Sequence, residues 1–187
     1  MNKTLLIYSL VSPLLLLALF MNLNASRASF SIQDEASLSG GLIGKKSPEL
    51  SEGHWINSSP HRFSDFQDRV VLLEFWTYGC YNCRNTIPVV NEWQKKYANQ
   101  NFAIIGVHTP EFDTEKNLAS VQQQVVRLGI QYAVVTDNEY ATWESYHQQF
   151  WPTIYLIDKK GIIRYQQIGE GNYNETERMI RTLITER

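Results

Sequence analysis

Cysteine is scarce in this sequence: Cys80 and Cys83 are the only two among 187 residues. A pair separated by two residues closes too small a loop to cross-link distant parts of a fold, which argues against a stabilising disulfide framework. Histidine is also rare, and the four histidines lack the paired spacing of a zinc site. Arg84 stands after Cys83, where covalent haem attachment needs histidine. Chemistry at the two sulfur atoms is the better explanation of the pair.

An excess of positive charge is absent as well. Lys and Arg number 17 against 19 Asp and Glu, and no basic run could form a phosphate-binding stripe, so nucleic acid is not an expected partner. Hydrophobic residues make up 43% of the chain and charged residues 19%, an ordinary balance for a globular protein with a core. The length is typical of one domain, with room for an appendage.

The N-terminus is a long apolar run. Residues Thr4–Leu23 contain no charge, and Lys3 precedes them, which is typical of a secretory signal. Ser26 and Ala28 offer a cleavage site after Ala28, but about 20 apolar residues also suffice for an uncleaved membrane anchor. The sequence therefore predicts export, with residues 1–28 as a signal peptide or an anchor and no other membrane contact.

Residues 29–46 are rich in Ser and Gly and are predicted to form a flexible linker. From residue 47 onward, apolar patterns of strands and helices alternate. Strands are predicted at 54–57, 70–75, 102–107, 132–135, 153–158 and 161–166, and helices at 80–97, 114–128, 138–149 and from Asn174 onward, with Thr114 and Asn174 as helix caps. This order predicts a single α/β domain at 47–187, a three-layer α/β/α sandwich with a mainly parallel sheet and an antiparallel edge hairpin.

The cysteines lie where the buried strand 70–75 ends and the next helix begins. A helix N-terminus carries unpaired N–H groups and partial positive charge, which stabilise a thiolate. Cys80 at the tip is therefore the expected attacking thiol. Cys83 lies one turn further on the inward apolar face, and is the expected shielded thiol that resolves a mixed disulfide.

A thiol peroxidase is an alternative interpretation of the same cysteine. Thr77 lies three residues before Cys80, a spacing found in peroxidase centres. The peroxidase pattern also places a proline four residues before that threonine, and Leu73 stands there. The dithiol interpretation therefore fits the residues better.

Residues 74–83, with the sequence EFWTYGCYNC, resemble the acidic–Phe–Trp approach to the CxxC motif in the thioredoxin family. Pro88 matches the family's helix-kinking proline, and Trp151-Pro152-Thr153 stands where the family has its cis-proline. The additional α-β unit at about 114–135 is similar to the insertion of the TlpA-like redoxins.

Further segments resemble the extracytoplasmic module of DipZ-type proteins: residues 76–83, 106–112, 140–143 and 169–174. In DipZ-type proteins this module is fused to a membrane domain that carries electrons, which these 187 residues are not expected to contain. The resemblance implies a thioredoxin-like fold, disulfide-containing proteins as partners, and a membrane electron donor of the DipZ/DsbD type.

Two further residues gain expected roles from this resemblance. Glu74 lies within an apolar strand, and a buried carboxyl group tends to keep its proton near neutral pH. The family uses an acid here as a proton relay for the resolving thiol, which in this chain is Cys83. Pro152 is expected in the cis form, where it would align an extended partner. Trp151 before it departs from the small or β-branched residue that the family usually has.

The residues expected to contact a partner surround the motif. Trp76 and Tyr78 precede the cysteines, and His108 and Glu111 follow the second parallel strand, whose carboxyl end borders the site. The full set of expected substrate contacts is Trp76, Tyr78, Tyr81, Asn82, Trp151, His108 and Glu111.

Together these observations predict an extracytoplasmic thiol–disulfide oxidoreductase, in the periplasm or its equivalent. Its redox-active Cys80–Cys83 pair needs no metal and no bound cofactor. The direction of electron flow does not follow from the residues, although the DipZ resemblance favours a reductase. A peroxidase and a non-catalytic peptide-binding redoxin module remain the alternative functions.

Overall fold

The computed structural model describes residues 41–186 and contains one six-stranded sheet in the order β1-β4-β3-β2-β5-β6. The strands are β1 (Trp55–Ile56), β2 (Val70–Trp76), β3 (Phe102–His108), β4 (Ala133–Thr136), β5 (Thr153–Ile157) and β6 (Ile163–Ile168). The helices are η1 (Phe63–Phe66), α2 (Tyr81–Tyr97), η2 (Asp113–Lys116), α3 (Leu118–Arg127), α4 (Ala141–Ser145) and α5 (Tyr173–Thr185). The order of strands and helices confirms the expected α/β fold.

The sheet is mixed rather than mainly parallel. Strand β3 pairs in parallel with β2 and β4, whereas β2–β5, β5–β6 and β1–β4 are antiparallel pairs. The expected hairpin is present as β5–β6, and its Gly161 adopts a φ of +76° in the turn. The difference arises because β5, the first strand of the hairpin, lies directly against β2 inside the sheet, which makes a central pairing antiparallel as well.

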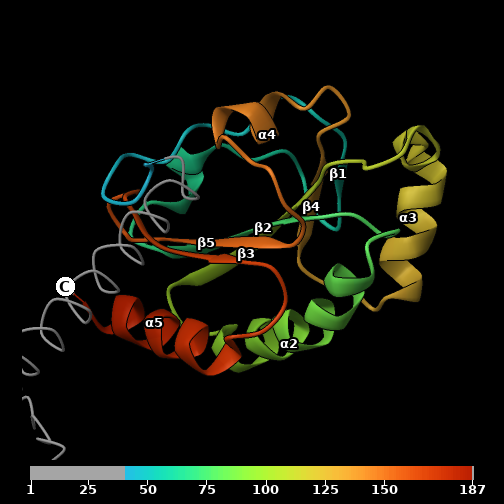
Figure 1. Ribbon diagram of the computed structural model, residues 1–187. Helices are drawn as coiled ribbons and strands as arrows, with labels where there is room; N and C mark the ends of the chain where they lie inside the picture. The colour runs from blue at the N-terminus through green and yellow to red at the C-terminus, as the bar shows by residue number, and fades with distance from the viewer. Residues whose placement is uncertain (1–40, 187) are drawn as a thin grey trace, which may run out of the picture. The chain divides into compact units, whose positions relative to one another are not determined.

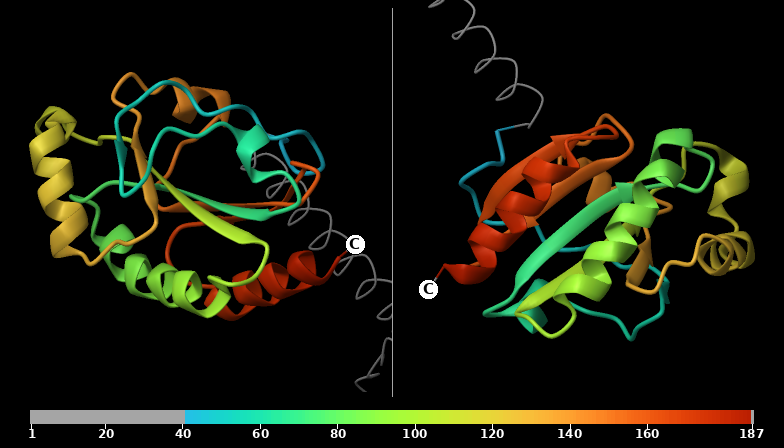
Figure 2. Two further views of the ribbon diagram at one scale, coloured as in Figure 1. Left: turned by 180° about the vertical axis from the view of Figure 1, so that it is seen from behind. Right: turned by 90° about the horizontal axis from the view of Figure 1, so that it is seen from below.

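Helices cover both faces of the sheet, as the three-layer prediction requires. Helices α2 and α5 lie together on one face, while α4 and the segment that contains η1 lie on the other (Figures 1 and 2). Strands β2 and β3 are buried along their whole length, in keeping with their continuous apolar sequences. The carboxyl end of β2 leads directly into α2, which places the two cysteines at one end of the central strands.

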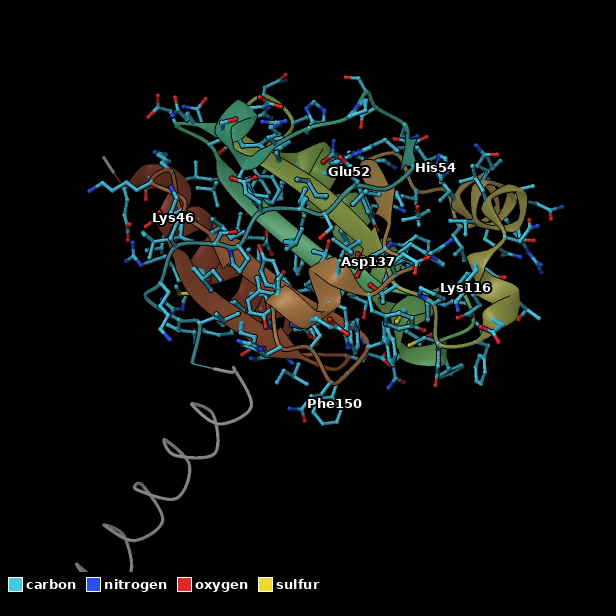
Figure 3. All side chains as sticks on the ribbon, turned by 90° about the horizontal axis from the view of Figure 1, so that it is seen from above. Lys46, Glu52, His54, Lys116, Asp137 and Phe150 are labelled. Carbon is cyan, nitrogen blue, oxygen red and sulfur yellow. The ribbon has the colours of Figure 1, made fainter. Side chains whose placement is uncertain are left out.

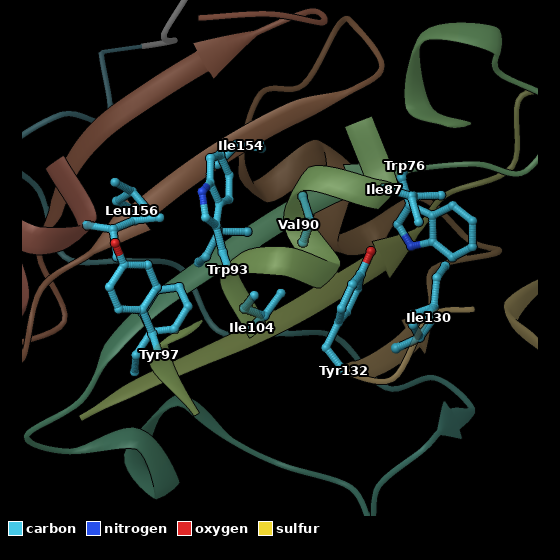
Figure 4. Packing of buried hydrophobic residues seen from close by; sticks show 14 of the residues in the cluster. Trp76, Ile87, Val90, Trp93, Tyr97, Ile104, Ile130, Tyr132, Ile154 and Leu156 are labelled. Atoms are coloured by element: carbon cyan, nitrogen blue, oxygen red, sulfur yellow. The ribbon is translucent and has the colours of Figure 1, made fainter. Parts of the chain in front are cut away.

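The face of the sheet beneath α2 carries one of two apolar clusters. The inward stripe of α2 is buried as expected: Cys83, Ile87, Val90, Trp93 and Tyr97. Figure 4 shows this helix side packed against Ile104, Ile154 and Leu156 of the central strands. The second cluster, on the opposite face, contains Phe75 and Tyr146.

Three helix boundaries differ from the sequence prediction. Asn117, whose side chain accepts a hydrogen bond from the Ser120 N–H, caps α3, and Thr114 lies in the preceding 3-10 turn. Helix α4 has only five residues, because His147 takes a positive φ of 51° soon after it. Helix α5 begins after Asn172 at φ 52°, two residues before the expected cap Asn174.

The folded part begins before residue 47. Leu42 is buried in the second cluster, and Lys46 forms a β-bridge with Ile162 beside β6. Residues 41–46, which the sequence assigns to the linker, thus belong to the domain. The expected signal or anchor at 1–28 and the linker residues 29–40 lie outside the described residues. Within residues 41–186, no helix has the length and apolar character needed to cross a membrane.

Candidate active site around Cys80 and Cys83

Cys80 forms the N-cap of α2. Its extended backbone, with φ −66° and ψ 120°, ends the loop that leaves β2, and its Sγ accepts a hydrogen bond from the Cys83 N–H at 3.2 Å. Cys80 is partly accessible, whereas Cys83 is completely buried. The structure thus brings the two thiols together in the unequal environments that the sequence predicts.

Hydrogen bonding separates the acidities of the two thiols. A hydrogen bond from the Cys83 side chain, together with the Cys83 N–H, lowers the pKa of Cys80 to about 7, against the effect of partial burial. Burial raises the pKa of Cys83 far above its ordinary value, and the hydrogen bond to Cys80 raises it further. At neutral pH Cys80 is therefore the thiol with a substantial thiolate fraction, and thiolate is the nucleophilic form.

Glu74 lies in the middle of β2, between Gly106 of β3 and Ile154 of β5. Its side chain is completely buried, and burial raises its pKa to about 8 in spite of a hydrogen bond from Tyr132. The charge of Glu74 in turn raises the pKa of Cys83, so the two groups interact electrostatically. The buried carboxyl group therefore holds its proton at neutral pH, and its expected role as a proton relay for Cys83 stays a prediction.

The peptide bond between Trp151 and Pro152 is cis, as the family resemblance implies. The Trp151 indole N–H donates to the Thr109 carbonyl at 3.1 Å, and its ring stacks on Trp143 with 4.1 Å between centroids. These contacts fix Trp151 between α4 and the loop after β3. Phe150 immediately before it projects outward from the domain (Figure 3) and is 44% exposed.

Two of the expected partner contacts are enclosed. Trp76 and His108 are both fully buried, and His108 is the last residue of β3 rather than part of the following loop. Burial lowers the pKa of His108 to about 4, so its ring is neutral at pH 7 and stacks on Tyr78. Both residues support the active-site loop from below and offer no surface to a partner.

The other expected contacts are accessible in varying degree. Tyr81 is 68% exposed, Asn82 and Glu111 are exposed, and Tyr78 and Trp151 are half-buried. Their position around Cys80 keeps them available for a partner, and their roles stay predictions.

Tyr132 and Trp143 were not identified from the sequence. Tyr132 lies just before β4 and reaches Glu74 from the insertion, packed beside Trp76 (Figure 4). Trp143 supports Trp151 from α4. Tyr132 leads into an apolar strand and Trp143 stands in a short helix, where an aromatic residue is equally typical of an ordinary core, so only the spatial neighbour reveals the role.

Metal ligands do not gather in the part of the chain that the structure describes. No group of three His, Cys, Asp or Glu side chains there could hold a metal ion.

A comparison with family profiles matches residues 43–166 to the AhpC/TSA family. The chain belongs to the AhpC/TSA family. Among curated proteins it is 42% identical over 135 residues to Protein DipZ of Mycobacterium tuberculosis, a match that covers 71% of this chain but 19% of DipZ. It is also 25% identical over 140 residues to the thiol-disulfide oxidoreductase YkuV of Bacillus subtilis, covering 74% of this chain and 94% of YkuV.

Solved structures show the same fold. A thiol-disulfide isomerase from Corynebacterium glutamicum superposes with a TM-score of 0.68 at 23% identity, covering 75% of this chain and 98% of that structure. The chain is thus a thioredoxin-fold redoxin that resembles the DipZ module. Its paired cysteines stand at the tip of α2, and the relative YkuV carries the name thiol-disulfide oxidoreductase.

Proposed function

We propose that this protein reduces disulfide bonds of protein partners outside the cytosol, through the Cys80–Cys83 dithiol. The observation that carries the proposal is the placement of Cys80, whose sulfur caps α2 and receives the Cys83 N–H, above the buried carboxyl group of Glu74. This arrangement supplies a nucleophile, a shielded second thiol and a proton acceptor within one site.

The reaction is a two-electron exchange in two steps. The Cys80 thiolate attacks one sulfur of a partner disulfide, a mixed disulfide forms, and the other partner sulfur leaves as a thiolate that takes up a proton. Cys83 then gives its proton to the ionised form of Glu74 and attacks the Cys80 sulfur. The second partner thiol is released, and the Cys80–Cys83 pair is left oxidised.

The acidity of Cys80 supports the reductase direction. A strongly acidic attacking cysteine stabilises the reduced form of a dithiol and makes its disulfide a strong oxidant, as in DsbA. Thioredoxin, a reductant, has a cysteine pKa near 7. The pKa of about 7 for Cys80 is similar to the thioredoxin value and therefore supports the proposal of a reductase.

The location and the electron source are drawn from the sequence and its relatives. The apolar run Thr4–Leu23 favours export, and the DipZ-like identity favours an extracytoplasmic module. An exported reductase must be reduced again after each turnover. A membrane protein that passes electrons outward, of the DipZ/DsbD type, is the donor we propose.

The decisive experiment follows the disulfides of insulin during reduction by the purified chain, with dithiothreitol supplying electrons. We expect faster precipitation of the reduced insulin chains with the wild type than with dithiothreitol alone, and no acceleration with Cys80→Ser. A protein that consumes hydrogen peroxide steadily and leaves insulin intact would instead be a thiol peroxidase. Envelope fractionation of cells that express the full chain tests the location, and recovery in the cytosol would contradict export.

A further inference from the structure

Glu115 is a buried carboxylate that the proposed mechanism does not use. It lies in η2, within the insertion between β3 and β4, and only 2% of its surface is exposed. Its Oε1 accepts the Gly79 N–H at 2.9 Å, and its Oε2 accepts the N–H groups of Glu111 at 2.7 Å and Phe112 at 3.2 Å. Charge-assisted hydrogen bonds of this kind compensate a carboxylate for the loss of water.

A second hydrogen bond joins the same two segments. The hydroxyl of Tyr78 donates to the Thr114 carbonyl at 3.0 Å, so two consecutive residues before Cys80 are attached to two consecutive residues of the insertion. A Cβ atom at Gly79 would lie 2.2 Å from Oε1 of Glu115. The close approach of the carboxylate therefore requires glycine at this position.

The hydrogen bond between Gly79 and Glu115 affects the position of Cys80, the proposed nucleophile. Gly79 precedes Cys80, whose sulfur receives the Cys83 N–H only while Cys80 keeps its capping conformation. The other oxygen of the Glu115 carboxylate holds Glu111, whose charge opposes the ionisation of Cys80. The Glu115 side chain thus fixes both the loop that precedes Cys80 and the loop that contains Glu111.

We propose that Glu115 is a positioning residue for Cys80: its carboxylate ties Gly79 to the insertion and so holds the Cys80 sulfur at the start of α2. Its importance in turnover rests on the proposed function, whereas its effect on the position of Cys80 does not. The insertion between β3 and β4 thereby becomes a support for the active-site loop.

Removal of the Glu115 carboxylate should change the pKa of Cys80 in one direction if Glu115 acts only through its charge, and in the other direction if it positions Cys80. Removal of a nearby negative charge by itself favours the thiolate and lowers the pKa of Cys80. Loss of the attachment weakens the hydrogen bonds from Cys83 and raises that pKa. The direction of the change therefore separates a positioning residue from a mere neighbouring charge.

The test measures the rate at which iodoacetamide alkylates Cys80 in the reduced full chain between pH 5 and pH 9, by mass spectrometry of the modified peptide. We expect Glu115→Gln to move the midpoint upward by roughly half to one pH unit, since one side-chain oxygen cannot serve all three donors. The matched control is Asp113→Asn on the same turn, whose exposed carboxylate pairs with Lys116 and should leave the midpoint in place. An unchanged or lowered midpoint in Glu115→Gln would overturn the proposal.

A double-mutant cycle tests the contact itself. In the wild-type background, Gly79→Ala forces a Cβ atom against Oε1 and should raise the midpoint, whereas in a Glu115→Ala background the space is free and the same change should have little effect. Additive shifts would overturn the proposal. If Glu115→Ala does not fold, Gly79→Ala and Tyr78→Phe must each raise the midpoint alone, or the proposal fails.

Alkylation of Cys80 requires no catalytic turnover, so the result of this test does not depend on the proposed function. A wild-type chain that fails to reduce insulin would contradict the proposed function, while the alkylation profiles would still decide the role of Glu115.

Discussion

The hydroxyl of Tyr132 donates a hydrogen bond to Oε2 of Glu74 at 3.0 Å, and both side chains are fully enclosed beneath the active site. This hydrogen bond stabilises the ionised form of Glu74. It lowers the pKa of Glu74, which burial nevertheless raises to about 8. Tyr132 thus connects the insertion to the group that is proposed to accept the Cys83 proton.

Tyr132→Phe should slow resolution more than attack. Without the hydroxyl, the pKa of Glu74 rises further, less carboxylate is present at pH 7, and resolution of a mixed disulfide should slow about fivefold. Stopped-flow measurement of both steps with a fluorescent peptide disulfide checks this expectation. Tyr97→Phe is the matched control, because it removes a Tyr–Glu hydrogen bond of 2.8 Å at the far end of α2. Equal resolution rates in the two variants would remove Tyr132 from the relay.

The unequal burial of the cysteines predicts unequal labelling. Cys80 should be alkylated by iodoacetamide with a midpoint near pH 7, and Cys83 should resist modification until the protein unfolds. Mass spectrometry of the native protein, repeated in guanidinium chloride as the unfolded control, measures both rates. Comparable labelling of the two thiols at pH 7 in the native state would contradict the assigned roles.

The sequence revealed those features whose cause is local. The apolar run 70–75, the inward stripe of α2 and the position of Cys80 at the helix tip all follow from spacing along the chain. The cis form of the Trp151–Pro152 bond came from the family resemblance rather than from spacing. The helix predicted at 138–149 is present only over Ala141–Ser145, because His147 takes a positive φ of 51° although the polar residues around it can continue a helix.

Features that depend on distant segments could not be found in this way. Glu115 and Gly79 are separated by 36 residues, and Tyr132 and Glu74 by 58. An acidic residue in a polar turn is usually solvated, and nothing near Glu115 in the sequence indicates burial. The enclosure of Trp76 and His108 likewise results from packing between α2, β2 and β3, which alternation of residue types does not specify.

Glu74→Gln should change how stability depends on pH. The folded pKa of about 8 lies above the ordinary value of 4.5, so the folded state binds the proton more tightly and its stability falls as pH rises from 4.5 to 8. On the order of 3 kcal/mol of wild-type stability should disappear between pH 5 and pH 8 for this reason. Urea denaturation of the reduced protein should show a flatter profile in Glu74→Gln, with the variant more stable than wild type at pH 8.

Glu177→Gln is the control for that measurement. Hydrogen bonds from Lys96 and Tyr97 lower the pKa of Glu177, so its contribution is present above its unfolded pKa and is lost as pH falls through the folded value. Its removal should affect stability at neutral pH and leave the slope between pH 5 and pH 8 unchanged. Parallel profiles for wild type and Glu74→Gln would show that Glu74 is not buried in its protonated form.

The mixed disulfide offers the most direct view of the mechanism. In Cys83→Ser the second thiol is missing, so partners attacked by Cys80 should stay covalently attached and appear as new bands on non-reducing gels. Cys80→Ser should trap few partners, because Cys83 is buried and its raised pKa leaves little thiolate.

Glu74→Gln keeps both thiols and the approximate volume of the side chain but removes the proton acceptor. Attack by Cys80 should therefore survive in Glu74→Gln while release slows, which gives a transient population of the same complexes. Stronger trapping by Cys80→Ser than by Cys83→Ser would reverse the nucleophile assignment, whereas release at the wild-type rate in Glu74→Gln would remove only Glu74 from the mechanism.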